Sequence, residues 1–226
     1  MRLLGELGRQ REDLRGELRK LEGDLREQMS LSEEQGQIGN MFREVMQQGF
    51  PGVLGRLGDL GEVSREHDEI ITTCCSRLDN IVVTDLPTAS TVLDFLKARK
   101  LGRATCIILE KIGEHRNYMN RPFENLPRAV RLFDLIKFRT EEAKLAFYFA
   151  LNDTLYCEDS DLGMEYSMKN DHYRRRVISK NKNRNGYIIY EVNGLMAGCA
   201  PRRGGFVPKA TTKKAKPQTD HPKELE

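Results

Sequence analysis

The chain has 226 residues, of which 38% are apolar and 31% are charged, and its net charge is +3. This length allows one or two domains with a proper hydrophobic core. The small net charge does not by itself indicate a nucleic-acid-binding protein, and no stretch is apolar and long enough for a signal peptide or a membrane span. We therefore expect a soluble, intracellular protein without a membrane partner.

The cysteines predict neither disulfides nor a metal site. There are five, no CxxC pair occurs, and only Cys74 and Cys75 are adjacent. Several lie in apolar runs, where a reduced and buried thiol is the usual state. We expect a reducing compartment, no bound metal and no cofactor.

Residues 1–48 form the first predicted segment, a helix that serves as a coiled-coil arm. Leu14, Leu18, Leu21 and Leu25 follow the 4-3-4 spacing of a coiled-coil seam, and Glu and Arg fill the flanks. So few heptads are marginal alone, and glycines weaken the helix further. The leucine face is covered either by a partner helix or by the protein's own domain.

Residues 52–61, GVLGRLGDLG, carry glycine at every third position. The run lacks the lysine and hydroxyl of a phosphate-binding P-loop, and its spacing is not GxGxxG. It is also too short for a collagen-like helix. Glycine in such a place indicates a bulge or a close approach of backbones.

Short strands then alternate with helices through residue 200. In the first half we expect a helix over 66–78, a strand over 80–85, a helix opening at Pro87 and stopping at Gly102, and a strand over 104–109. In the second half we expect a helix from Thr140, a strand over 154–159, a helix over 161–170, a strand over 174–180, a hairpin turn at Asn185–Gly186 and a strand over 187–192.

The two halves resemble each other. A shift of 74 positions places NIVVTD on TLYCED, Asp79 on Asp153 and Asp85 on Asp159. We predict an α/β (α+β) domain over 49–200, built of two similar subdomains over 49–112 and 131–200 with a loop over 113–130 between them. The polar, Pro/Lys-rich segment 201–226 is predicted to be a disordered basic tail.

No catalytic set stands out. Cys74 lies seven residues from His67, too far for direct contact along a straight helix. We therefore expect no catalytic residue, no small-molecule substrate and no enzymatic activity.

A basic cluster lies late in the chain. Between residues 169 and 218 the only acids are Asp171 and Glu191, and tyrosines that could stack on bases are interleaved. The alternative is a solvated basic face. The predicted DNA-binding residues are Arg174, Arg175, Arg176, Lys180, Lys182, Arg184, Arg202 and Arg203.

The blocks GVLGRLGDLG, TTCCSRLDNIVVTD, FLKARKLGRATCIIL, RLFDLIKF and AFYFALNDTL, in this order, resemble the hinge domain of structural maintenance of chromosomes (SMC) proteins. The likeness covers residues 50 to about 200 and is strongest to the larger SMC-type subunit of eukaryotic condensin. It implies two pseudo-symmetric α/β subdomains and a heterodimer with the hinge of a second SMC-type subunit. It also implies DNA contact and a place on chromosomes in the nucleus, with the cytoplasm as the alternative.

The resemblance further implies a dimer interface at glycine motifs. The positions concerned are Gly194, Met196 and Gly198 and, less directly, Gly55 and Gly58. Cys199 and Ala200 stand where the family has further glycines, so their side chains could crowd a close contact. Because ATPase head motifs and a returning coiled coil are missing from this sequence, we expect a fragment, a truncated paralogue or a stand-alone, nucleic-acid-binding hinge-like protein.

Overall fold

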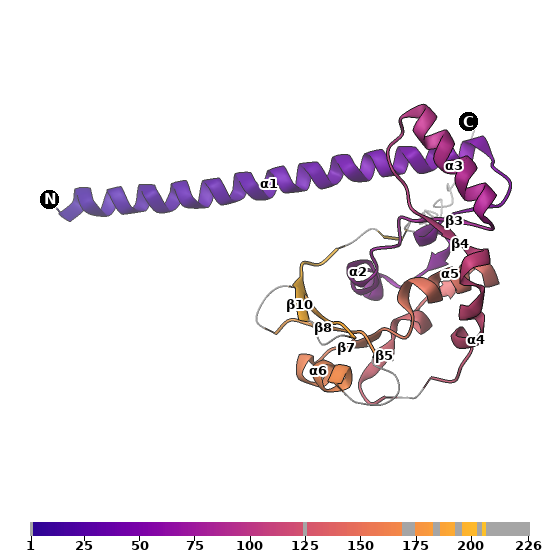
Figure 1. Ribbon diagram of the computed structural model, residues 1–226. Coiled ribbons are helices and arrows are strands. Elements are labelled where there is room, and N and C mark those ends of the chain that lie inside the picture. The colour runs from indigo at the N-terminus through magenta and orange to yellow at the C-terminus, as the bar shows by residue number, and fades with distance from the viewer. Residues whose placement is uncertain are drawn as a thin grey trace, which may run out of the picture.

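The computed structural model describes residues 2–123, 126–168, 175–182, 186–192, 196–202 and 205–206. A long helix, α1 (Arg2–Gln48), projects from a domain that holds all the other elements (Figure 1). No helix in the described part of the chain is both long and apolar enough to cross a membrane.

Three leucines in the far part of α1 are exposed to solvent. Leu14, Leu18 and Leu21 are 64%, 56% and 67% exposed, whereas Met41 and Val45, near its end, are buried against α3 and β3. The domain therefore covers the end of the helix and not Leu14, Leu18 or Leu21 of the seam. That a partner helix covers this seam stays a prediction.

The first half is a three-stranded sheet with helices around it. Strand β3 is central, antiparallel to β1 and parallel to β4. Its elements are β1 (Val53–Arg56), the 3-10 helix η1 (Leu57–Asp59), β2 (Gly61–Glu62), α2 (Arg65–Cys74), β3 (Ile81–Val83), α3 (Leu86–Arg99) and β4 (Cys106–Ile108).

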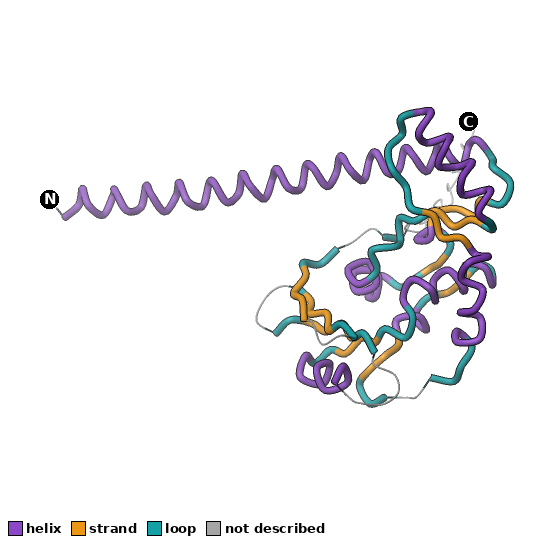
Figure 2. The backbone as a smooth tube through the Cα atoms, viewed as in Figure 1, coloured by secondary structure: helices purple, strands orange, loops and turns teal. Residues whose placement is uncertain are grey.

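The second half repeats this plan and adds a hairpin. Strand β7 is antiparallel to β5 and parallel to β8, and β9 and β10 extend the sheet in the order β10-β9-β8-β7-β5 (Figure 2). Its elements are β5 (Ala129–Arg131), η3 (Leu132–Leu135), β6 (Lys137–Phe138), α5 (Glu141–Leu151), β7 (Leu155–Cys157), α6 (Ser160–Met168), β8 (Val177–Lys180), β9 (Tyr187–Tyr190) and β10 (Met196–Cys199). The predicted repeat and the predicted β8–β9 hairpin are confirmed.

Two sequence predictions differ from the structure in detail. The connection over 113–130 is not simply a loop, since η2 (Leu109–His115), α4 (Arg116–Met119) and the start of β5 fall in or across it. Helix α3 ends before the expected stop at Gly102, because Lys100 takes up the left-handed conformation at φ 54° and its N–H caps the last turn.

One arginine holds two aspartates in each half. Arg56 contacts Asp59 at 2.9 Å and Asp79 at 2.7 Å. In the second half Arg131 contacts Asp134 at 2.6 Å and Asp153 at 3.1 Å. Each cluster fastens the turn after the first strand to the segment before the central strand, so the sequence repeat GRLGDL and VRLFDL is also a repeat of ion pairs.

Strands β2 and β6 join the two halves. They pair antiparallel, with Gly61 opposite Phe138. A Cβ atom at Gly61 would lie 2.7 Å from the ring of Phe147. Glycine is therefore required where the two halves meet.

The chain returns from β10 to the first half along a C-terminal strap, which we define as residues 200–202 and 205–206. The N–H of Arg202 donates to Thr73 Oγ1 at 2.8 Å, and Arg56 Nη2 donates to the Gly205 carbonyl at 3.1 Å. Phe206 is buried and stacks on Phe147 with ring centroids 6.0 Å apart. The predicted boundary at residue 200 is therefore too early, because the strap belongs to the fold; 203–204 and 207–226 lie outside the described residues.

Gly58 is the point of closest approach to this strap. A Cβ atom added there would collide with the carbonyl oxygen of Gly205, which is backbone and has little freedom to move. The close backbone contact predicted from the glycine run is thus present, and its partner lies in the same chain.

We predict that Gly58→Ala lowers the free energy of unfolding by about 1–3 kcal/mol, because the new methyl group overpacks the contact with Gly205. Gly113→Ala is the control, since a Cβ there meets no atom within 4 Å. Urea unfolding of both variants measures the difference. Equal stability of the two variants would contradict the proposed contact.

Candidate functional site

Strand β10 forms an exposed edge of the five-stranded sheet. Met196, Ala197 and Gly198 are exposed, with Met196 63% accessible. Within the described chain β10 pairs with β9 on one side, and no strand pairs with its other side. Such an edge offers its backbone N–H and C=O groups to another strand.

Gly198 and Cys199 lie differently on this edge. A Cβ atom at Gly198 would meet no atom within 4 Å, so the space above it is open. The Cys199 side chain instead packs against the main core, with its sulfur 3.8 Å from the Tyr187 carbonyl. The expected crowding by Cys199 is therefore reduced, while Ala200 is exposed.

Of the other predicted interface residues, Gly55 and Gly58 are not on this edge. Gly194 lies outside the described residues. Gly55, at φ 135°, belongs to β1, and Gly58 is buried under the strap. The interface role of all five predicted residues stays a prediction.

Strand β4 is a second edge, in the other sheet. It pairs with β3 on one side, and no strand in the described part of the chain occupies its other side. Ile107 is buried, whereas Cys106 and Ile108 are half-buried. Among the described strands, β4 and β10 are therefore unpaired edges, one in each half, and β1 and β5 are the other end strands of the two sheets.

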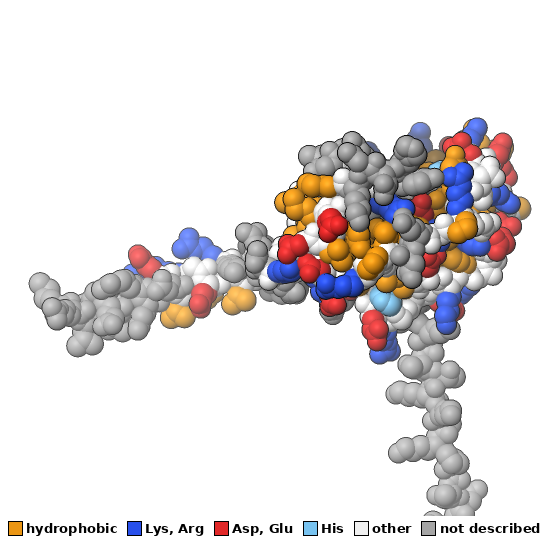
Figure 3. Space-filling model, turned by 90° about the horizontal axis from the view of Figure 1, so that it is seen from below, with side chains coloured by type: hydrophobic (Ala, Val, Ile, Leu, Met, Phe, Trp, Pro, Cys, Tyr) orange, Lys and Arg blue, Asp and Glu red, His pale blue; other side chains and the backbone are white. Residues whose placement is uncertain are grey.

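Acidic side chains already balance much of the basic cluster. Lys180 contacts Glu158 at 3.1 Å, and Lys182 contacts Asp161 at 2.9 Å and Asp159 at 3.0 Å. The hydrogen bonds that Lys182 donates to the Asp161 and Asp159 carboxylates raise the pKa of Lys182. In Figure 3 acidic and basic side chains are interspersed on the face that it shows.

The sequence interpretation missed these pairs because the acids precede the basic window. Strands β7 and β8 are parallel, with Cys157 opposite Ser179, so Glu158 and Lys180 come to lie side by side. The parallel pairing of β7 and β8 is the signal that would have predicted these ion pairs. Arg176 is held by Glu191 at 2.9 Å, Arg175 lies over Phe123, Arg202 is exposed, and Arg174, Arg184 and Arg203 lie outside the described residues.

Known proteins match this fold and sequence. Residues 50–167 match the family described as SMC proteins Flexible Hinge Domain. The chain belongs to this hinge family. The match stops before β8, β9, β10 and the strap, which the structure adds to the domain.

Relatives and solved structures agree with this membership. The hinge is 41% identical over 151 residues to mouse "Structural maintenance of chromosomes protein 4", covering 66% of this chain and 11% of that protein. It matches the Pyrococcus furiosus SMC hinge domain with TM-score 0.54 and 25% identity, covering 77% of this chain and 87% of that one. The Geobacillus stearothermophilus SMC hinge, described as an asymmetric dimer, matches with TM-score 0.55 and 22% identity, covering 71% and 65%.

Three of the cysteines, Cys74, Cys75 and Cys157, are buried in the core. Burial raises the pKa of the Cys74 thiol to about 12 and that of Cys157 to about 11. His67 bonds to Ser64 Oγ through Nδ1 at 2.8 Å. Among the described residues no group of three His, Cys, Asp or Glu side chains is placed to hold a metal.

We predict that Cys74 and Cys157 resist iodoacetamide at pH 8 in the folded hinge, because the raised pKa leaves almost no thiolate and burial blocks access. Cys199 and Cys106, which are half-buried, should be labelled first. Mass spectrometry of peptides from native and urea-unfolded protein measures this order. Labelling of Cys74 at equal rates in both states would contradict its burial.

Proposed function

We propose that this hinge is a non-enzymatic dimerisation module that pairs with the hinge of a second, condensin-type SMC subunit on chromosomes in the nucleus. The observation that carries the proposal is the exposed edge of β10, with open space above Gly198. The match spans 11% of the mouse relative, and the proposal concerns the hinge alone.

Two of the sheet edges, β10 and β4, fit a closed pair. The β10 edge of one hinge meets the β4 edge of its partner, and the partner's β10 edge meets this chain's β4. Backbone hydrogen bonds between the edges provide affinity, and the side chains at alternate positions provide specificity. Two such contacts form a ring that leaves neither edge open.

We predict that Gly198→Val weakens partner binding at least about 10-fold, corresponding to a loss of about 1.4 kcal/mol. The new side chain would meet nothing in its own chain but would stand between the two edges. Sedimentation velocity of the chain mixed with the partner hinge measures the affinity.

Gly39→Val, on α1 in equally open space, is the matched control and should bind normally. Both variants should melt close to the unsubstituted chain. Partner binding that is unchanged in Gly198→Val would refute the role of β10.

DNA contact is a second proposed role, and its alternative form is a nucleic-acid-binding hinge that needs no SMC partner. The exposed Arg202 supports it, and Arg175 is a second predicted contact. Acids hold Lys180, Lys182 and Arg176. Attraction to phosphates by such residues depends strongly on salt.

We predict that the double charge reversal Arg175→Glu and Arg202→Glu weakens binding of a short single-stranded DNA at least about 5-fold in low salt, because each reversal removes a phosphate contact. Each lost contact should also lower the slope of log affinity against log salt concentration by about 1. Lys97→Glu, an exposed residue on α3, is the control. Fluorescence anisotropy over a salt series measures both effects. An unaltered affinity in the double variant would rule out this surface as the DNA contact.

A further inference from the structure

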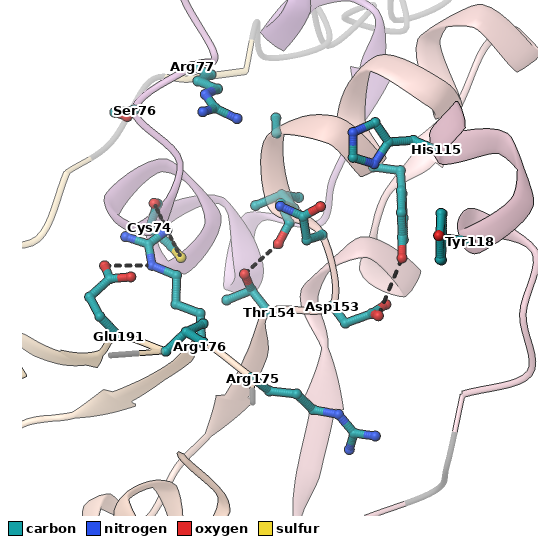
Figure 4. Close-up of a pocket in the computed structure, with 15 residues that line it drawn as sticks. Cys74, Ser76, Arg77, His115, Tyr118, Asp153, Thr154, Arg175, Arg176 and Glu191 are labelled. Carbon is teal, nitrogen blue, oxygen red and sulfur yellow. Dashed lines mark hydrogen bonds and ion pairs between the residues drawn. The ribbon is translucent and has the colours of Figure 1, made fainter. Parts of the chain in front are cut away.

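A cleft of about 1010 Å³ lies between the two halves and is separate from the β10 edge (Figure 4). Its walls come from the end of α2, from η2 and α4, from the end of α5, and from the residues flanking β8 and β9. This volume is at the upper end of the range of small-molecule sites, roughly 300–1,000 Å³. The size suits one small organic ligand better than a protein segment.

The carboxylates of the cleft are already matched by arginines. Asp153 is held by Arg131 at 3.1 Å and also accepts a hydrogen bond from the Tyr148 hydroxyl at 3.3 Å. Glu191 is held by Arg176 at 2.9 Å. Each of these ion pairs is neutral, so the net charge of the cleft depends on its other cationic groups.

Arg77 is a surplus cation of the cleft. Its Nη1 donates to the Phe149 carbonyl at 3.0 Å, and its guanidinium lies 4.7 Å from the centre of the Phe149 ring. No carboxylate among the described residues lies within ion-pair distance of it. The ring and the carbonyl thus orient a guanidinium at the cleft without neutralising it, and such a group binds a phosphate by two parallel hydrogen bonds.

Aromatic rings form the wall beside His115. Tyr118 is 45% exposed, and Arg121 lies 4.3 Å from the centre of its ring. His115 packs edge-on against Tyr148 and Phe149, with centroids 6.2 and 5.5 Å apart. In Figure 4 the His115 and Tyr118 side chains stand on one side of the cleft, and Arg176 and Glu191 stand on the other.

We propose that this cleft binds a nucleoside phosphate. The phosphate pairs with Arg77, the base stacks on Tyr118 beside His115, and the carboxylates of Asp153 and Glu191 accept hydrogen bonds from sugar hydroxyls. A nucleoside phosphate carries an anion, a planar ring and several hydroxyl donors. These groups match the guanidinium, the exposed ring and the carboxylates of the cleft, respectively. A simple inorganic anion would use only the first of these.

Calorimetric titration of the full chain with adenosine 5′-monophosphate tests the proposal. We expect a dissociation constant below about 1 mM, and at least 10-fold weaker binding of adenosine and of inorganic phosphate taken separately, because each loses one group of contacts. No binding of the monophosphate at millimolar concentration overturns the proposal.

Two variants locate the site. Arg77→Gln should weaken binding at least about 10-fold through the lost charged hydrogen bonds, and Tyr118→Ala at least about 5-fold through the lost stacking. Arg43→Gln, on α1, is the control and should bind normally. Because Tyr118 is exposed, Tyr118→Ala keeps the test valid if Arg77→Gln unfolds. Unchanged affinity in the folded variants overturns the proposal.

The pairing and DNA tests separate this proposal from the proposed function. Arg77→Gln should pair with the partner hinge as the unsubstituted chain does, since Arg77 lies on neither β4 nor β10. If single-stranded DNA binds through Arg77 and the monophosphate does not, the cleft is a DNA contact and the nucleoside phosphate proposal is overturned.

Discussion

The fold depends on the approach of the C-terminal strap to the turn after β1. At Gly58 the backbone comes so near to the Gly205 carbonyl that no side chain fits between them. Arg56, already bound to Asp59 and Asp79, also donates to that carbonyl. One guanidinium therefore fastens the end of the domain to its beginning.

The same position shows why the two halves are similar but not interchangeable. Phe133 in the second half corresponds to Gly58 in the first, 75 positions later. Its ring is buried and packs against Tyr148 and Phe138. A phenylalanine fills the second half from within, while a glycine in the first half leaves room for the strap. The repeat thus supplies two equivalent frameworks. The glycine in place of phenylalanine lets the first of them bind the C-terminal strap.

The strap also explains how β10 can remain exposed. Directly after Cys199 the chain turns toward α2, where Arg202 meets Thr73. The cysteine side chain packs inward and the open position at Gly198 faces away from its own chain. An edge strand without such anchoring at its end would be expected to fray, so the strap holds in place the edge that we propose as the pairing surface.

Local signals made much of the fold predictable from the sequence. Pro87 and Asp85 mark the start of α3, Thr140 caps α5 through the Ala143 N–H, and Asn185–Gly186 separates two antiparallel strands. These signals act over a few residues, so they survive in a single sequence.

Long-range features were not predictable in the same way. Phe206 lies in a polar, Pro/Lys-rich setting, and only its stack on Phe147 shows why it is buried. The acids that hold Lys180 and Lys182 come from a neighbouring segment that the charge count left out. The cleft needs both halves to be placed, since Arg77 comes from the first half, Tyr118 from the connection and Asp153 from the second half.

Hydrogen exchange of the hinge, alone and mixed with its SMC partner hinge, tests the central claim most directly. The account predicts that the amides of β10 and β4 become protected in the mixture, while those of α3 keep their rates. A complex that forms while β10 and β4 exchange as fast as in the free chain would contradict edge pairing as the mechanism of this hinge.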